Sequence, residues 1–304
     1  MILSRPVLAF LLFGMTACAT APLPPAAEVQ PPPPVMSEAA RQLHERNLAE
    51  ARSAYEKSPD DADAIIWLGR RTAYLGRYAE TIAIFSEGAR KHPLDARMLR
   101  HRGHRWITLR QFDRAVADLE HAALLVRGKL DEIEPDGLPN ARNIPTSTLQ
   151  SNIHYHLGLA HYLRGDLSRA LEAYRACASV STNPDGVVSS SYWLYSILRR
   201  LGREDEAREV LEPIRAEMDV IENGTYHKLL LMARGEHDPA ALAVQDVSTV
   251  DGVTLLYGVG NWYLYNGQSA RAEELFRQII AGPQWAAFSF IAAEAELTRH
   301  GRGD

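Results

Sequence analysis

The feature that most constrains this chain is an internal pattern that recurs four times with fixed spacing. In each copy a helix-like segment contains a glycine, a small residue follows twelve positions later, and a large apolar residue comes four positions after that. The glycines are Gly69, Gly103, Gly158 and Gly260, the small residues are Thr81, Ala115, Ala170 and Ala272, and the large residues are Phe85, Leu119, Tyr174 and Phe276. From 69 to 103 is 34 residues, and from 158 to 260 is 102, or three times 34. A fixed period of this length is typical of a solenoid built from helical hairpins.

These residues resemble the tetratricopeptide repeat (TPR) pattern over roughly residues 60–300. The resemblance is strongest at Leu68, Gly69, Gly76, Tyr78, Phe85, Pro93, Leu157, Gly158, Gly165, Ala170 and Tyr174. Ala64 and His154 stand where the pattern has its early tryptophan, and Trp67 is displaced from it. The resemblance implies an all-α fold, a right-handed TPR-like α-solenoid of helical hairpins with N- and C-terminal capping helices.

Glycine and proline positions divide the array into hairpins. Repeats are predicted at about 62–95, 96–127, 149–182, 186–218 and 252–282, with a degenerate repeat at about 219–250 and capping helices at about 37–57 and 285–300. A glycine inside a helix costs about 1 kcal/mol relative to alanine. Its recurrence at one position therefore predicts a close approach of the two helices of a hairpin, against the small residue of the second helix.

One connection is too long for the period. From position 110, the turn of repeat two, to Gly165 is 55 residues, which is 34 plus 21. The 21 or so inserted residues must lie within 127–149, and a loop of this length is usually functional or disordered. Because Ile133, Leu138 and Ile144 provide apolar anchors, we expect an ordered loop folded onto the array. Its acidic residues do not follow the EF-hand ligand order, so a solvated turn is favoured over a calcium site.

The N-terminal segment Met1–Cys18 has one arginine, Arg5, and the apolar run Val7–Met15. A membrane span needs about 20 apolar residues, so residues 1–18 are predicted to be an export signal. The sequence Met-Thr-Ala-Cys that ends it resembles a bacterial lipobox, which implies lipidation of Cys18. By resemblance to other such lipoproteins, Ala19 after this cysteine implies an outer-membrane protein that faces the periplasm. An ordinary secretory signal cleaved near the same cysteine is the alternative.

Residues 19–36 are dense in proline, which excludes a helix or a central strand and predicts a disordered tether. Fully extended, the sixteen residues 20–35 would reach roughly 50 Å at about 3.1 Å per residue. The folded domain is accordingly expected at 37–304.

Composition excludes some classes of function. The chain has 304 residues, of which 46% are hydrophobic and 23% charged, and its net charge is −5. This balance is ordinary for a soluble domain and lacks the basic excess of a nucleic-acid binder. Two cysteines are too few for a disulfide framework, and Cys177 is expected to be a packed core thiol.

The sequence contains no nucleophile-elbow, zinc-protease or phosphate-loop motif, so no catalytic residue is predicted. His101 and His104 share a helix face, and His154, His156 and His161 lie on another helix, but their spacing does not provide a tetrahedral zinc site. We predict a protein without metal or cofactor that is not an enzyme.

In the TPR family the first helix of each hairpin lines the concave side. Carried onto this sequence, those positions form an expected binding groove at Arg70, Tyr74, Arg97, Arg100, His104, Asn152, Tyr155, Tyr162, Tyr192, Ser196, Arg199, Tyr257, Asn261 and Tyr265. Tyrosine offers rigid contact area with a hydroxyl group, and arginine recognises carboxylates in forked pairs. The alternative is that some of these tyrosines pack between repeats. The lysines and asparagines of the carboxylate clamp found in chaperone-binding TPR domains are absent.

Three functions remain open at this point. The leading hypothesis is a non-enzymatic, lipid-anchored adaptor that binds a protein or peptide in its concave groove, resembling outer-membrane TPR lipoproteins that scaffold envelope machinery. The second is a binder of a glycan or another cell-wall-derived ligand, and the third is an enzyme whose site is assembled from several repeats. Homodimerisation stays open, because TPR surfaces often self-associate.

Overall fold

The computed structural model describes residues 31–301. Within this range the chain forms fourteen helices, and its only strand-like pairing is an isolated antiparallel bridge between Ile133 and Thr148. The predicted all-α, TPR-like fold is confirmed. The expected signal peptide, Cys18 and most of the tether lie outside the described residues. None of the helices in residues 31–301 is long and apolar enough to cross a bilayer.

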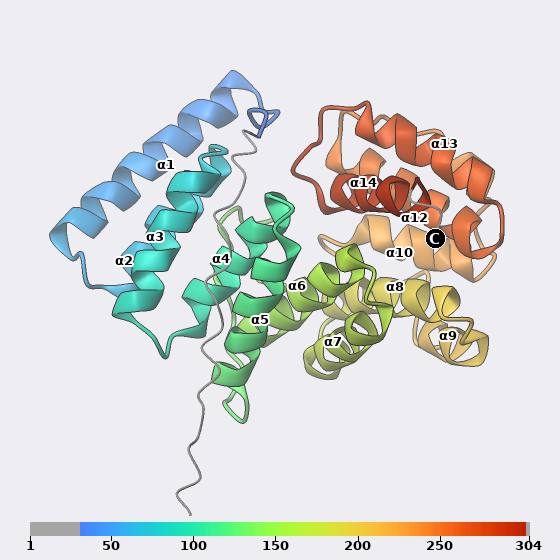
Figure 1. Cartoon of the computed structure of the whole chain (residues 1–304), viewed down its shortest axis with the longest axis horizontal. Helices are drawn as coiled ribbons and strands as arrows, with labels where there is room; N and C mark the ends of the chain where they lie inside the picture. Colours follow the sequence, from blue (N-terminus) through green and yellow to red (C-terminus); the bar gives the residue numbers. More distant parts are fainter. Residues whose placement is uncertain (1–30, 302–304) are drawn as a thin grey trace, which may run out of the picture.

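Most helices pair into antiparallel hairpins in chain order (Figure 1). They are α1 Glu38–Lys57, α2 Ala62–Tyr74, α3 Tyr78–Lys91, α4 Ala96–Thr108, α5 Phe112–Val126, α6 Leu149–Arg164, α7 Leu167–Val180, α8 Pro184–Arg200, α9 Glu204–Leu211, α10 Gly224–Ala233, α11 Pro239–Leu242, α12 Val250–Tyr265, α13 Ser269–Ile280 and α14 Phe288–His300. The degenerate repeat consists of α10 and the four-residue α11. Helix α1 and the first helices of five hairpins, α2, α4, α6, α8 and α12, each begin at a polar side chain that accepts a hydrogen bond from a backbone amide of the first turn. These capping residues are Ser37, Asp61, Asp95, Thr148, Asn183 and Thr249.

The turn of each hairpin needs a residue in the left-handed region. Glycine fills this position in five turns, with φ between +69° and +87°, because it has no Cβ to clash. These residues are Gly76, Gly165, Gly202, Gly235 and Gly267. Arg110 takes the same place in the α4–α5 turn, with φ +59°. Only a strong set of side-chain contacts can hold a non-glycine residue there.

The recurrent helical glycines do allow close packing, but the partner differs from the prediction. A Cβ at Gly69 would lie 2.5 Å from the Phe85 ring, and one at Gly158 would lie 2.6 Å from the Tyr174 ring. Each glycine therefore faces the large apolar residue of the second helix and not the small one. The physical reason is that the ring needs the space that the missing Cβ leaves, whereas the small residues are buried elsewhere in the same interface.

Substituting Gly158 with alanine is expected to lower the free energy of unfolding by about 1–3 kcal/mol, because the added methyl group overlaps the fully buried Tyr174 ring. Gly224→Ala is the matched control, since nothing lies within 4 Å of a Cβ at that helical glycine. Urea unfolding of both variants measures the difference. Equal free energies of unfolding for the two variants would show that the Tyr174 ring can move away from the added methyl group without a loss of stability.

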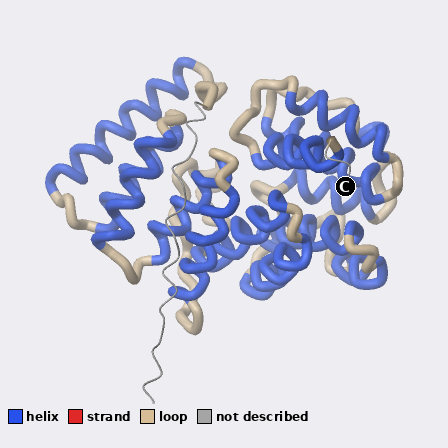
Figure 2. The backbone as a smooth tube through the Cα atoms, in the orientation of Figure 1, coloured by secondary structure: helices blue, strands red, loops and turns tan. Residues whose placement is uncertain are grey.

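The chain curves so that its last helix returns to its middle. Figures 1 and 2 show α1–α3 on one side and α12–α14 on the other, with α4–α8 between them. Helix α14 packs against α12 and α13 and also reaches α6. Arg110 in the α4–α5 turn forms an ion pair with Glu294 of α14 at 2.8 Å. The C-terminal helix thus caps the array and also closes its curve.

The connection between α5 and α6, residues 127–148, is hereafter called the insert. Its two ends pair through the Glu134 amide to the Ser147 carbonyl, at 3.2 Å, next to the isolated bridge. Its middle reaches in two directions: Arg71 of α2 donates to the Gly137 carbonyl at 2.8 Å, and Arg142 pairs with Asp219 at 2.7 Å. The insert therefore lies across the array from α2 to the segment before α10.

Candidate functional site

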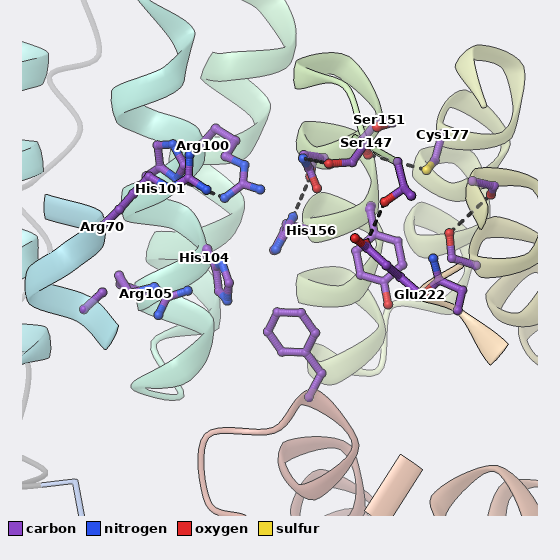
Figure 3. Close-up of a pocket in the computed structure, with 18 of the residues that line it drawn as sticks. Arg70, Arg100, His101, His104, Arg105, Ser147, Ser151, His156, Cys177 and Glu222 are labelled. Carbon is purple, nitrogen blue, oxygen red and sulfur yellow. Dashed lines mark hydrogen bonds between the residues drawn. The ribbon is translucent and has the colours of Figure 1, made fainter. Parts of the chain in front are cut away.

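A cavity of about 370 Å³ lies on the concave side of the array. Its walls come from the first helices of four hairpins, α2, α4, α6 and α8, from Cys177 and Ser181 at the end of α7, and from the insert (Figure 3). Phe85 of α3, Glu222 and Asn223 before α10, and Phe288 at the start of α14 complete the lining. We call this cavity the concave pocket.

One wall of the concave pocket is basic. Arg100, His101, His104 and Arg105 come from α4, and Arg70 comes from α2. The α4 residues are spaced by one and four positions, so helix geometry gathers them on one side. Figure 3 shows them facing His156 of α6 across the cavity.

Glu134 of the insert brings a negative charge to this wall. Its Oε2 lies 3.0 Å from Arg100 Nε, and the side chains retain only 7% and 9% of their exposure. Asn152 donates a hydrogen bond to the same carboxylate at 3.2 Å. The expectation of a solvated acidic turn is therefore wrong for Glu134, because this carboxylate is buried in an ion pair.

His101 is neutral in this arrangement. Arg100 has only donors, so its contact of 3.0 Å with His101 Nδ1 places the ring proton on Nε2. That nitrogen points toward Glu134, 3.8 Å from Oε1. Burial, followed by the charge of Arg100, holds the pKa of His101 well below its usual value of 6.5.

His156 forms the opposite wall of the pocket. Its Nδ1 donates to the Asn152 carbonyl at 2.6 Å, because a carbonyl oxygen can only accept. Its ring lies 4.6 Å from the ring of His104, centroid to centroid. Burial and then nearby arginines hold the pKa of both rings well below 6.5, so both are neutral at neutral pH. Neutral His156 therefore has its Nε2 lone pair free for a hydrogen bond.

Arg105 differs from the other arginines of the pocket. Within residues 31–301 no carboxylate lies within ion-pair distance of it, and its guanidinium sits 5.8 Å from the Tyr78 ring centroid. Burial lowers the pKa of Arg105 to about 10, which still leaves it charged at neutral pH. The pocket thus holds a positive charge that has no carboxylate partner among residues 31–301 and lies near an aromatic ring.

The thiol of Cys177 also lines the pocket, but it is poorly suited to act as a nucleophile. Burial raises its pKa to about 12, so the thiol stays protonated at neutral pH. It donates a weak hydrogen bond to the Ser151 carbonyl at 3.5 Å. Within the described part of the chain, no three His, Cys, Asp or Glu side chains are arranged to hold a metal ion.

The expected groove residues fall into three groups. Six line the concave pocket, namely Arg70, Tyr74, Arg100, His104, Asn152 and Tyr155. Their role in binding remains a prediction. Tyr155 has its hydroxyl engaged by Trp193 at 2.9 Å and by Tyr226 at 3.0 Å, so it does not offer the pocket a free hydroxyl.

Five other residues that were expected to face the binding groove are buried instead, so this expectation is wrong for them: Tyr162, Tyr192, Ser196, Tyr257 and Asn261. The physical reason is that α12 packs directly against α8, and α14 against α6, so positions expected to face a groove become interior. The hydroxyls of Tyr162 and Tyr257 meet at 2.8 Å, and Tyr192 stacks on Tyr226 at 4.7 Å. The alternative that tyrosines pack between repeats holds in this half of the array.

Arg97, Arg199 and Tyr265 lie outside the concave pocket. Arg97 pairs with Asp95 and Asp63, each at 2.6 Å, beside a separate depression near the start of the insert. Arg199 donates to Asn266 at 3.0 Å and stacks on Tyr265 at 4.7 Å. Both arginines therefore have partners within the chain.

Sequence reasoning missed several residues of the pocket. His101 and His156 were weighed as metal ligands and were not included in the expected groove, and Arg105, Asn223 and Phe288 were not singled out. Glu134, which pairs with the lining residue Arg100, was expected in a solvated turn. Arg105 could have been found, because it follows His104 on the same side of α4. The local sequence has no signal for Phe288, which reaches the pocket only through closure of the array. It has none for Glu134 either, which reaches Arg100 only through folding of the insert.

Comparison with known proteins gives similarity of fold alone. No protein-family model and no curated protein matches the chain. A solved TPR protein with an unusual peptide-binding site, YrrB, aligns at 15% identity over 81% of this chain and 97% of its own, with a TM-score of 0.42. A tetratricopeptide repeat protein from Parabacteroides merdae aligns at 14% identity over 85% of this chain and 94% of its own, with a TM-score of 0.48.

Proposed function

We propose that this protein is a non-enzymatic adaptor that holds a segment of a partner protein in its concave pocket while a lipid on Cys18 anchors it to the outer membrane, facing the periplasm. The observation that carries the proposal is the pocket itself. It is assembled from the first helices of successive hairpins and combines charged donors with aromatic surface. Such walls supply both orientation and contact area to a bound peptide.

The contacts of the insert support this mode of binding. Arg70 of α2 donates to the Pro135 carbonyl at 2.7 Å, and Arg71 donates to the Gly137 carbonyl at 2.8 Å. Arg100 holds the Glu134 carboxylate of the same segment. Side chains of the first helices thus already bind main-chain carbonyls and a carboxylate of an irregular segment of this chain, which is the chemistry that a partner peptide would offer.

Filling the pocket is expected to release the partner. Ser189 of α8 lines the pocket, so Ser189→Trp places an indole in the cavity, whereas Ser179→Trp makes the same change on an exposed position of α7. Affinity capture after chemical crosslinking in intact cells, read by mass spectrometry, compares the two variants with the unchanged protein. We expect the unchanged chain and Ser179→Trp to capture the same partner proteins, and the captured amount to fall at least tenfold with Ser189→Trp. Equal capture by all three would exclude the pocket as the binding site.

Anchoring is expected to depend on one sulfur atom. Cys18→Ser removes the thiol that accepts the lipid, so incorporation of a labelled fatty acid should be lost and the protein should leave the membrane fraction. Cys177→Ser is the matched control, because that cysteine is buried in the folded domain. Labelling that persists in Cys18→Ser would contradict the lipid anchor.

A glycan or other cell-wall-derived ligand is the second candidate. The size of the pocket, about 370 Å³, favours it, because small-molecule sites typically enclose about 300–1,000 Å³. Calorimetric titration of the protein with soluble wall fragments tests this function. Binding of fragments that Ser189→Trp abolishes, together with no pocket-dependent protein partner, would favour the ligand over the adaptor.

A further inference from the structure

We infer that the concave pocket contains a second carboxylate site, formed by Arg105, His104 and His156, where an acidic group of the partner binds together with a proton. The inference rests on the proposed function and deepens it, because it names the chemical group of the partner that the pocket recognises. The group is a carboxylate, which a peptide can supply from an acidic side chain or from its C-terminus.

The first carboxylate site of the pocket is already filled from within the chain. Glu134 is held by Arg100 and Asn152, at 3.0 Å and 3.2 Å. Glu222, the acidic residue that lines the pocket, accepts hydrogen bonds from Thr146 at 2.6 Å and from Asn140 at 2.7 Å. Neither carboxylate is therefore available to balance the remaining positive charge.

Arg105 is that remaining charge. It projects from the same side of α4 as His104 and lines the cavity, without a carboxylate within ion-pair distance in residues 31–301. A guanidinium offers a planar fork of donors that matches a carboxylate. An unpaired, largely buried cation facing a cavity indicates an anionic ligand.

His156 supplies the second contact and the proton. Its side chain is only 4% exposed, its Nδ1 is engaged by the Asn152 carbonyl, and its Nε2 has no partner among the described residues. While the ring is neutral, Nε2 can only accept. A carboxylate beside it favours the protonated ring, whose Nε2–H then donates to one carboxylate oxygen while Arg105 donates to the other.

The surroundings of the two imidazoles determine the sign of the pH effect. The charged and titratable groups around them are Arg100, His101 and Arg105 from α4, Arg70 and Tyr74 from α2, Tyr155 from α6, Cys177 from α7, Glu222 before α10 and Glu134 of the insert. The residues that α8 and α14 contribute, Ser189, Gly186 and Phe288, carry no charge. Burial and the arginines depress the pKa of His104 and His156 in the free protein. A bound carboxylate raises it again, so binding takes up a proton and strengthens as pH falls.

Isothermal titration calorimetry of the full 304-residue chain tests the site with three alanine-based pentapeptides. One has a central glutamate and blocked ends, one has a free C-terminal carboxylate and no acidic side chain, and one has a central glutamine and blocked ends. We expect at least one acidic peptide to bind at least tenfold more tightly than the glutamine peptide, and the tighter of the two identifies the source of the carboxylate. Between pH 8 and pH 6 its affinity should rise, by at most about tenfold per pH unit for one proton. Repeating the titration in two buffers with different ionisation enthalpies gives the number of protons taken up on binding, because the observed binding enthalpy then differs by that number times the difference in ionisation enthalpy.

Variants separate this site from the rest of the pocket. Arg105→Gln should weaken the acidic peptide at least tenfold, Arg105→Lys should weaken it less, and Arg46→Gln, on an exposed position of α1, should leave it unchanged. Circular dichroism and thermal unfolding confirm that each variant is folded. Peptides that bind equally well with glutamate and glutamine would overturn the carboxylate site and leave the adaptor function standing. Failure of both acidic peptides to bind, or acid binding that Arg105→Gln does not weaken, would also overturn it.

Discussion

Replacing Glu296 with glutamine is expected to lower the free energy of unfolding by about 3–5 kcal/mol, because it removes one partner of a buried ion cluster. Glu296 of α14 has no exposed surface. Its Oε1 accepts from Arg200 of α8 and lies 2.6 Å from Arg299. Without the carboxylate, two partly buried arginine side chains remain with no compensating charge.

The cluster joins four helices, which explains the size of the expected effect. Arg200 also donates to the Tyr162 hydroxyl of α6 at 2.9 Å, and that hydroxyl meets Tyr257 of α12 at 2.8 Å. Arg299 donates to the Leu163 carbonyl at 2.9 Å. Loss of the central charge therefore weakens the attachment of α14 to the rest of the array.

Urea unfolding at neutral pH measures the effect. Glu87→Gln is the control, because the Glu87–Arg90 pair is solvent-exposed and such pairs contribute little. If Glu296→Gln lowered the free energy of unfolding no more than the control does, the desolvation cost of the buried carboxylate would equal the stabilisation that its ion pairs provide.

The same carboxylate makes stability depend on pH. Burial raises the pKa of Glu296, but Arg200 and Arg299 together outweigh it, so the pKa lies below the usual 4.5. A depressed carboxyl pKa contributes stability above the pKa of the unfolded chain and loses it as pH falls through the folded value. The difference between the unchanged protein and Glu296→Gln should accordingly shrink below about pH 4.5.

Arg110→Ala is expected to lower the free energy of unfolding by about 2–4 kcal/mol, through loss of a stacked cation and charge-assisted hydrogen bonds. The guanidinium lies 3.8 Å from the Trp285 ring centroid. It donates to Glu294 at 2.8 Å and to the Trp285 carbonyl at 2.9 Å. These contacts join the α4–α5 turn to the C-terminal part of the chain.

Arg110→Gly separates the contacts from the backbone strain. Both variants lose the side chain, but only glycine relieves the left-handed conformation, which costs roughly 1–2 kcal/mol for other residues. Arg110→Gly should therefore be more stable than Arg110→Ala and less stable than the unchanged protein. Urea unfolding gives the order, and hydrogen exchange of α14 amides shows whether the closure loosens. A glycine variant more stable than the unchanged protein would mean that the contacts do not outweigh the strain.

The fold could be predicted from the sequence because each repeat carries its own local signals. The glycine in the first helix, the turn glycine and the apolar residue sixteen positions after the first all recur with the period of one hairpin. Nearest-neighbour packing then determines the array. The partner of the helical glycine was misassigned, since Gly69 and Phe85 meet through the space around a ring, which spacing alone does not describe.

The site could be predicted only where the array stays open. Arg100 and His104 of α4 reach the pocket as the repeat pattern implied. Tyr257 and Asn261 of α12 do not, because contacts between helices far apart in sequence bury the C-terminal half. The insert follows no repeat, so its placement of Glu134 beside Arg100 depends on tertiary contacts that no periodic pattern records.

Site-specific photocrosslinking in intact cells tests the central claim most directly. A photoreactive phenylalanine analogue at position 189 lies in the concave pocket, and the same analogue at position 179 lies on the outer helix α7. The account predicts a discrete crosslinked partner from position 189 that position 179 does not yield. Crosslinks from position 179 alone, or the same products from both positions, would contradict it.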